Sequence, residues 1–248
     1  MLTNGQKYGK IITVIERNTR KELKKMEKID KRIAKYIVLD TETANSIDCP
    51  LAYDIGFEVI DSKGRVYEKF SFTIADIYCG ERELMKSAYY ADKLPQYEEE
   101  MANGERKLVS LATAKKILAK ICRKYNVKAI MAHNARFDYR STTTTQRYIT
   151  KSANHYFFPY GVEIWDTLEM AKSVVKDKPT YKNYCEKRGF LTASGKPKLT
   201  AEVLYRFISG NDDFVEHHKG VDDVEIEKEI FVYCKRQHKK MKRSPWKE

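Results

Sequence analysis

Hydrophobic positions in the first half of the chain include three segments with the spacing of β-strands. Residues 36–39 form an uninterrupted apolar run, which predicts a strand buried on both faces. Residues 53–60 and 65–74 alternate between apolar and polar positions and carry many aromatic side chains. The polar residues between these two segments, with Gly64 supplying the positive φ of a turn, predict a β-hairpin.

Two short apolar runs and several segments with helical spacing follow. Residues 129–132 and 162–166 predict buried strands. The expected helices cover residues 110–125, with Ser110 as N-cap, and residues 168–175, 199–208 and 226–234. Residues 76–108 predict short helices and loop, and residues 185–198, which are rich in Gly and Pro, predict a loop. This mixture of strands and helices is typical of an α/β fold.

The two ends of the chain carry nearly all of its net charge of +12. Residues 1–35 hold eleven Lys and Arg against four acids, and residues 234–248 hold seven against one. Helical spacing in residues 11–35 predicts one or two amphipathic helices. We therefore divide the chain into a basic N-terminal extension (1–35), one domain (36–235) and a basic C-terminal tail (236–248). Basic arms favour binding to nucleic acid, and solvated tails that keep the protein soluble explain the same charge equally well.

The composition argues against several classes of protein. Five cysteines are scattered along the 248 residues and never form a Cys-x-x-Cys pair, which argues against a disulfide framework and a zinc ribbon. No apolar run approaches the roughly 20 residues of a membrane span, and the first residues lack the apolar core of a signal peptide. We expect a soluble, cytoplasmic protein that does not contact a membrane.

Acidic residues follow two of the predicted strands and begin the last helix. Asp40 and Glu42 stand one residue apart at the end of the first strand, so they share a face and can ligate the same hard cations. Asp138 follows the strand at residues 129–132, and the carboxyl ends of strands in open α/β sheets often carry the chemistry. Asp223 stands at the start of the last helix. Each of these patterns is common in proteins when it occurs alone.

Three motifs occur together in the order and approximate spacing of one family. They are Asp40-Thr41-Glu42, His133-Asn134-Ala135-Arg136-Phe137-Asp138, and the pair of His218 and Asp223. Through them the chain resembles the DEDDh 3′–5′ exonucleases, the group that includes the epsilon proofreading subunit of bacterial DNA polymerase III and RNase T. The resemblance covers residues 36–235. It implies an α/β, RNase H-like fold with a five-stranded mixed sheet, three antiparallel strands followed by two parallel ones, flanked by helices.

The histidine of the third motif has to be chosen, because two overlapping His-x-x-x-x-Asp pairs are present. In the family, the second residue after this His is small and the third is apolar. Counting from His218 meets both conditions, with Gly220 and Val221, whereas counting from His217 puts a lysine in the small position. We therefore pair His218 with Asp223.

The resemblance also implies a chemistry. Asp40, Glu42, Asp138 and Asp223 would hold two Mg²⁺ or Mn²⁺ ions, one generating the attacking water and one stabilising the departing 3′ oxygen. His218 would act as the general base. These five residues are the expected catalytic residues. The products would be nucleoside 5′-monophosphates, released from the 3′ end of DNA.

Several questions stay open from the sequence. Thr43, Asn134 and Phe137 flank the acids and are expected to position the terminal nucleotide, although packing around the acids explains them equally well. The substrate would be a single-stranded or frayed 3′ end. The alternatives are an RNA-trimming exoribonuclease like RNase T and a nucleic-acid-binding module without turnover, which the complete set of acids disfavours. A separate DNA polymerase and a second copy of the chain are the protein partners to consider.

Overall fold

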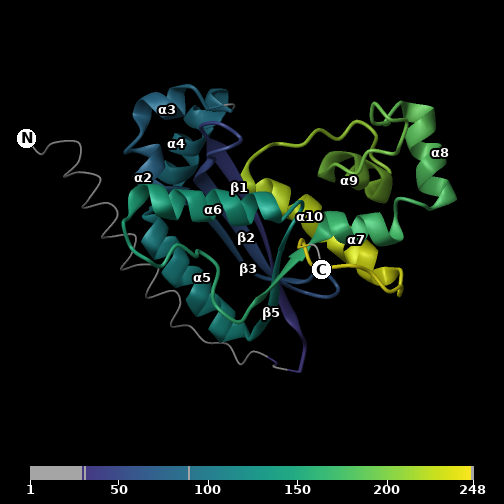
Figure 1. The fold of residues 1–248 in the computed structure, drawn as a ribbon, viewed down its shortest axis with the longest axis horizontal. Coiled ribbons are helices and arrows are strands. Elements are labelled where there is room, and N and C mark those ends of the chain that lie inside the picture. Colours follow the sequence, from purple (N-terminus) through teal and green to yellow (C-terminus); the bar gives the residue numbers. More distant parts are fainter. Residues whose placement is uncertain (1–29, 31, 89, 247–248) are drawn as a thin grey trace, which may run out of the picture.

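The computed structural model describes residues 30, 32–88 and 90–246. Six strands form one mixed sheet in the order β4-β3-β2-β1-β5-β6 (Figure 1). The strands are β1 (Lys35–Ala44), β2 (Leu51–Asp61), β3 (Val66–Ile74), β4 (Lys107–Val109), β5 (Val127–Ala132) and β6 (Glu163–Asp166). The amphipathic helices predicted within residues 11–35 lie almost entirely outside the described residues.

The predicted arrangement of the sheet is confirmed. β1, β2 and β3 are antiparallel to one another, and β5 and β6 continue the sheet in parallel with β1. The sheet has six strands rather than five because β4 pairs in parallel with β3 at the opposite edge. Leu108 and Val109 of β4 are buried. A strand of three residues in a polar segment contains too few positions to display a period in the sequence.

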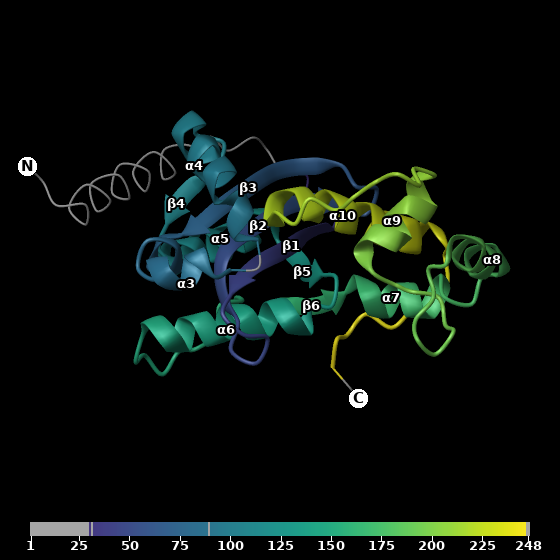
Figure 2. The ribbon, with the colours of Figure 1, turned by 90° about the horizontal axis from the view of Figure 1, so that it is seen from above.

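Helices cover both faces of this sheet. α10 lies on one side of the central strands and α6 on the other (Figure 2). The helices are α2 (Ala75–Tyr78), α3 (Arg82–Lys86), the short 3₁₀ helix η1 (Ala91–Lys93), α4 (Leu94–Asn103), α5 (Leu111–Tyr125), α6 (Arg136–Ile149), α7 (Thr167–Val174), α8 (Pro179–Arg188), α9 (Ala201–Ser209) and α10 (Gly220–Arg236). In the described part of the chain, none of them combines the length and the hydropathy needed to cross a membrane.

Alternate side chains of β1 enter two separate cores. Tyr36 and Val38 pack with side chains of α7, α9 and α10, whereas Ile37 and Leu39 pack with side chains of α5. All four are buried, which confirms the predicted strand with two buried faces. The same alternation continues along the strand, so the side chains at positions 40 and 42 face α10 and the side chain at position 41 faces α6.

Most predicted helix ends are confirmed, and one predicted loop is partly wrong. Ser110 caps α5 by accepting a hydrogen bond from the Thr113 N–H (3.2 Å). Gly210 ends α9 with a φ of 72°. The predicted loop at residues 185–198 is helical in its first part, because α8 extends into it and ends at Gly189. The proline at the first position of α8 signals a helix start, which the Gly- and Pro-rich composition of the following residues concealed.

Two segments pack against the ends of the sheet. Residues 75–109, which we call the insert, form a small core of their own against the ends of β1 and β2. Residues 237–246 leave α10, pass α7 and return to β6 (Figure 2). There the Asp166 N–H donates to the carbonyl of Arg243 (2.7 Å), and the Arg243 guanidinium lies 4.7 Å from the centre of the Trp165 ring. The described part of the basic C-terminal segment is therefore packed on the domain.

Candidate active site

The second half of β1 carries three consecutive polar residues between its two cores. Asp40 is half-buried and Glu42 is 9% exposed, and both face the side of α10. Thr41 between them is buried on the side of α6. Buried polar side chains need partners, and these three find them on the first turns of the two helices.

Asp138 lies buried on the first turn of α6. Its Oδ1 accepts hydrogen bonds from the backbone N–H (3.1 Å) and the hydroxyl (2.9 Å) of Thr41. The same hydroxyl lies 3.0 Å from that of Ser141. Asn134, with a φ of 69°, turns the chain from β5 into α6. Thr41 therefore ties the third acid to the strand that carries the first two.

α10 brings the fourth acid and the histidine to β1. The helix begins at Gly220, whose backbone touches that of Gly56 on β2. Asp223 lies buried on the first turn, and His218 precedes the helix by two residues. One ring nitrogen of His218 and one carboxylate oxygen each of Glu42 and Asp223 lie within 4.8 Å of one another. The structure thus brings the expected base together with acids from β1 and α10.

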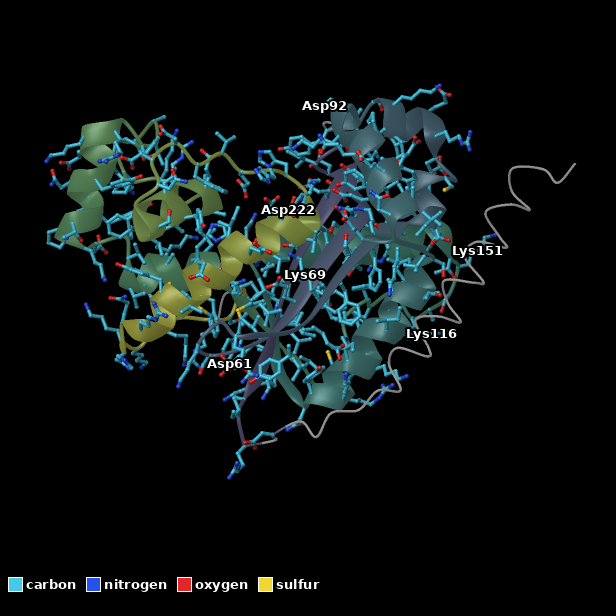
Figure 3. The ribbon with its side chains drawn as sticks, turned by 180° about the vertical axis from the view of Figure 1, so that it is seen from behind. Asp61, Lys69, Asp92, Lys116, Lys151 and Asp222 are labelled. Carbon is cyan, nitrogen blue, oxygen red and sulfur yellow. The ribbon has the colours of Figure 1, made fainter. Side chains whose placement is uncertain are left out.

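Neighbouring residues on α10 point in different directions. Asp222 is half-exposed and pairs with Lys219 (Nζ–Oδ2 3.2 Å). Farther along, Lys69 of β3 bonds Glu225 (Nζ–Oε1 2.5 Å). Figure 3 shows Asp222 and Lys69 along this helix. Asp222 is therefore a solvated, paired acid, whereas Asp223, the next residue, points into the cluster.

The two histidines before α10 also have different surroundings. The His218 backbone has a φ of 51°, and its ring stacks on Tyr90 of the insert with centroids 4.5 Å apart. His217 is exposed, with Nδ1 3.7 Å from Oδ2 of Asp222. Lys93 of the insert donates to the carbonyl of His217. Burial, followed by the charge of Lys93, lowers the pKa of His218, which favours a neutral imidazole near neutral pH.

The four acids have raised pKa values. Burial and neighbouring carboxylates raise the pKa of Glu42 to about 9 and that of Asp223 to about 8. Burial also raises the pKa of Asp138 to about 7, against the opposing effect of the Thr41 hydrogen bonds. Restricted hydration, and then nearby carboxylates, hold the pKa of Asp40 well above its usual range. In the folded protein each acid therefore favours a proton or a cation as its partner.

The donor set fits a divalent metal ion. Oδ1 of Asp223 is buried without a hydrogen-bond partner among the described residues, and an orphaned carboxylate oxygen is costly unless something binds it. Carboxylate oxygens are the ligands that Mg²⁺ and Mn²⁺ prefer. Asp40, Glu42, Asp138 and Asp223 are the residues that could hold such an ion.

A buried ion-pair network fixes the start of α10 against the insert. The Arg106 guanidinium, on a side chain that is 1% exposed, pairs with Asp54 of β2 and through Nε with Glu100 (2.7 Å). Asp54 also accepts the Gly220 N–H (3.1 Å), and Lys219 contacts Glu100 (2.7 Å). Breaking a buried pair leaves an uncompensated charge, so this network resists displacement. It therefore holds the turn that separates His218 from Asp223.

The three residues expected to bind the nucleotide lie close to the acids along the chain. Thr43 follows them after a bulge in β1 and is half-buried. Asn134 is exposed, and its N–H donates to Asp166 (3.0 Å). Phe137 is half-buried, with the Arg140 guanidinium 5.7 Å from the ring centre. Their role in positioning a nucleotide stays a prediction.

Sequence reasoning missed three residues beside the site: Thr41, Lys93 and Glu227. Glu227 lies one turn after Asp223 and is buried. A signal for it was present, because these two acids extend the same apolar stripe that marks the final helix. Thr41 and Lys93 gave no comparable signal, since their partners come from segments distant in the sequence.

Neither a protein-family model nor a curated protein sequence matches the chain. Among solved structures it is similar to a 3′-exonuclease described by its 3′-end specific recognition of the histone mRNA stem-loop. That likeness has a TM-score of 0.52 at 9% identity and covers 92% of this chain and 72% of the other.

Two further solved structures have lower TM-scores and add no argument. Exonuclease X in complex with 5′ overhanging duplex DNA has a TM-score of 0.39 at 14% identity, covering 82% of this chain and 92% of that one. Exonuclease I from Methylocaldum szegediense has a TM-score of 0.49 at 15% identity, covering 83% and 41% respectively. By the first likeness and the order of its strands, the chain has the fold of the RNase H-like 3′-exonucleases.

Proposed function

We propose that the chain is a metal-dependent 3′–5′ exonuclease that hydrolyses DNA from a 3′ end. The observation that carries the proposal is the convergence of Glu42, His218 and Asp223 within 4.8 Å, next to Asp40 and Asp138. Phosphodiester hydrolysis places negative charge on the attacking and leaving oxygens and on the phosphoryl group. A cluster of acids that can hold cations beside a neutral imidazole is suited to that reaction.

The four acids would hold two Mg²⁺ or Mn²⁺ ions, which when bound polarise water and neutralise charge on the scissile phosphate. The chain's own residues fix that site. Thr41 orients Asp138 through two hydrogen bonds. The network of Arg106 and Asp54 holds the first turn of α10, and with it the separation of Asp223 from β1.

His218 would accept the proton of the attacking water. Its lowered pKa leaves the imidazole unprotonated near neutral pH, as a general base requires. Tyr90 lies against one face of the ring and limits its rotation. The products would be a nucleoside 5′-monophosphate and a strand shortened by one nucleotide at its 3′ end.

RNA is the second candidate substrate, and one observation favours it. The 3′-exonuclease with the TM-score of 0.52 is described as recognising histone mRNA. The same acids and base serve either polymer, because attack of water on the phosphate does not use the 2′-hydroxyl. The two candidates therefore differ in contacts to that hydroxyl, which is the group that distinguishes RNA from DNA at a binding site.

Digestion of 5′-labelled oligonucleotides tests the proposal. Single-stranded DNA, duplex DNA and RNA of the same sequence are incubated with the full chain in Mg²⁺, Mn²⁺ or EDTA. We expect a ladder that shortens from the 3′ end, nucleoside 5′-monophosphates as products and no digestion in EDTA. The ratio of the DNA and RNA rates then selects the substrate.

Asp138→Ala is the control for contaminating nucleases. It should lose turnover, because it removes a ligand, yet keep a cooperative melting transition. Full activity in EDTA or in Asp138→Ala, or the release of internal fragments, would overturn the proposal. Binding of the oligonucleotides without digestion in either metal would establish a binding module instead.

A further inference from the structure

Glu227 is a buried acid on the inner face of α10 that the proposed mechanism does not use. Its side chain is 3% exposed, and it lies one helical turn after Asp223. It accepts a hydrogen bond from the backbone N–H of His133, just after β5. Its second oxygen, Oε2, is buried and has no partner among the described residues.

The charges around Glu227 are nearly all negative. Asp138, Asp223 and Glu216 are its charged neighbours, and Glu227 is in turn the nearest charged influence on Asp40. The lysines on the outer side of α10 are engaged elsewhere, Lys228 with Glu58 (3.4 Å) and Lys69 with Glu225 (2.5 Å). A buried acid without a cationic side chain beside it is costly, and an apolar residue would continue the stripe at this position at no such cost.

We propose that Glu227 is a fifth carboxylate of the metal centre, which supplies negative charge and a free hydrogen-bond acceptor next to Asp40 and so strengthens the binding of a divalent cation. This inference rests on the proposed function, which requires the cation. Residues that surround the ligands of a metal commonly set its affinity through charge and hydrogen bonding, and their loss weakens affinity by about 10- to 100-fold. Glu227 acts on the ion through the four ligands and is a positioning residue.

The competing role is structural, and the contacts separate the two. One oxygen of Glu227 accepts the His133 N–H, which is enough to hold β5 near α10. Glu227→Gln keeps that acceptor in its amide oxygen and has almost the same shape, but it cannot carry a charge. A structural Glu227 therefore tolerates this change, whereas a carboxylate of the metal centre does not.

The test is a titration of the full chain with Mn²⁺, in which electron paramagnetic resonance reports the free ion and no substrate is present. We expect Glu227→Gln to raise the Mn²⁺ dissociation constant about 10-fold or more relative to the wild type. The rise in melting temperature at a fixed Mn²⁺ concentration should fall accordingly. Glu229→Gln, a half-buried position on the same helix with the same change of charge, should bind Mn²⁺ like the wild type.

Each outcome has a definite meaning. A wild-type dissociation constant retained by Glu227→Gln overturns the inference, while the proposed function stands. Failure of the wild type itself to bind Mn²⁺ or Mg²⁺ overturns the proposed function as well. If Glu227→Gln does not melt cooperatively in EDTA, Glu227→Met replaces it, because its side chain is apolar and of similar length. Unweakened Mn²⁺ binding by that variant overturns the inference in the same way.

Discussion

Gly56 of β2 and Gly220 of α10 touch through their backbones. A Cβ atom on Gly56 would lie 2.3 Å from the carbonyl carbon of Gly220, and a Cβ on Gly220 would lie 2.9 Å from the Gly56 nitrogen. Neither atom met is the end of a flexible side chain that could move aside. The approach of α10 to the sheet, and so the placement of His218 and Asp223, depends on two missing side chains.

Gly56→Ala should therefore displace the start of α10. We expect a loss of about 1–3 kcal/mol in the free energy of unfolding, the usual cost of overpacking a core. We also expect a loss of turnover and of most of the metal-dependent rise in melting temperature, because Asp223 moves away from β1. Melting curves with and without Mg²⁺, together with the digestion rate, measure both effects.

Gly210→Ala is the matched control. It introduces the same methyl group at a position with open space around it but a φ of 72°, which strains any L residue. It should lower stability by a comparable amount without changing the response to metal. An equal loss of metal response in both variants would show that stability alone is being measured.

Thr41→Val tests the link between β1 and α6. Valine has nearly the shape of threonine but removes the hydroxyl that donates to Asp138, while the backbone N–H contact remains. We expect kcat to fall about 10- to 100-fold, as for other partners of metal ligands, with a smaller change in KM. Thr145→Val is the control, since that hydroxyl joins α6 to β2 at Ala52 (2.8 Å). It should reduce stability by about 1 kcal/mol and leave kcat unchanged.

Stability of the metal-free protein should fall as the pH rises from about 6 to about 9. Carboxyl groups titrate near 4 in an unfolded chain, whereas the pKa is about 7 for Asp138, about 8 for Asp223 and about 9 for Glu42 in the folded protein. Their protonated forms stabilise the fold at low pH, and that contribution is lost as the pH rises through the folded values. Melting temperatures in EDTA across this range measure the loss.

Metal binding should follow the opposite trend. The ligands must be ionised to bind a cation, so the apparent affinity for Mg²⁺ should increase over the same range of pH as protons are released. The gap between melting temperatures in Mg²⁺ and in EDTA should therefore widen with pH. A metal-free protein that grows more stable between about pH 6 and about pH 9 would contradict the raised pKa values.

His218→Ala should reduce turnover by about 10²–10⁴-fold, the usual effect of removing a general base. His217→Ala should change the rate little, because that side chain is exposed and contacts Asp222 outside the cluster. The acid limb of the rate–pH profile should change in the first variant only. A severe loss in His217→Ala would instead assign the base to the other His-x-x-x-x-Asp pair.

Deletion of residues 1–29 tests the basic N-terminal extension. If its lysines and arginines contact phosphates, each lost contact should flatten the dependence of log Kd on log salt for single strands by about 0.7. KM for long substrates should rise, and hydrolysis of a dinucleotide should keep its kcat. An unchanged slope with a lowered melting temperature would assign the segment a structural role.

The sequence predicted the parts of this fold that depend on periodicity over several residues. β1, the hairpin of β2 and β3, and α10 each repeat a pattern long enough to recognise. β4 and α8 were missed because a three-residue strand and a helix beside a Gly- and Pro-rich loop carry weaker signals. The central part of the sheet could thus be predicted, while its edge and the segment after α7 could not.

The candidate site divides in a similar way. Asp40, Glu42, Asp138 and Asp223 follow predicted strands or open a predicted helix, so topology alone places them near one another. The partners that hold them, such as Arg106 with Asp54, come from segments 52 residues apart in sequence with no shared motif. Such pairs depend on tertiary packing, which no local pattern records.

Because α10 supplies both His218's anchoring turn and Asp223, the cluster is assembled in the order of synthesis. A domain emerges from the ribosome at about 5–20 residues per second, and its N-terminal parts fold first. A nascent chain that ends before residue 218 already holds the acids of β1 and α6 but lacks the base and the last acid. A growing polypeptide of this sequence is therefore harmless to the messenger that encodes it until nearly the whole domain has been translated.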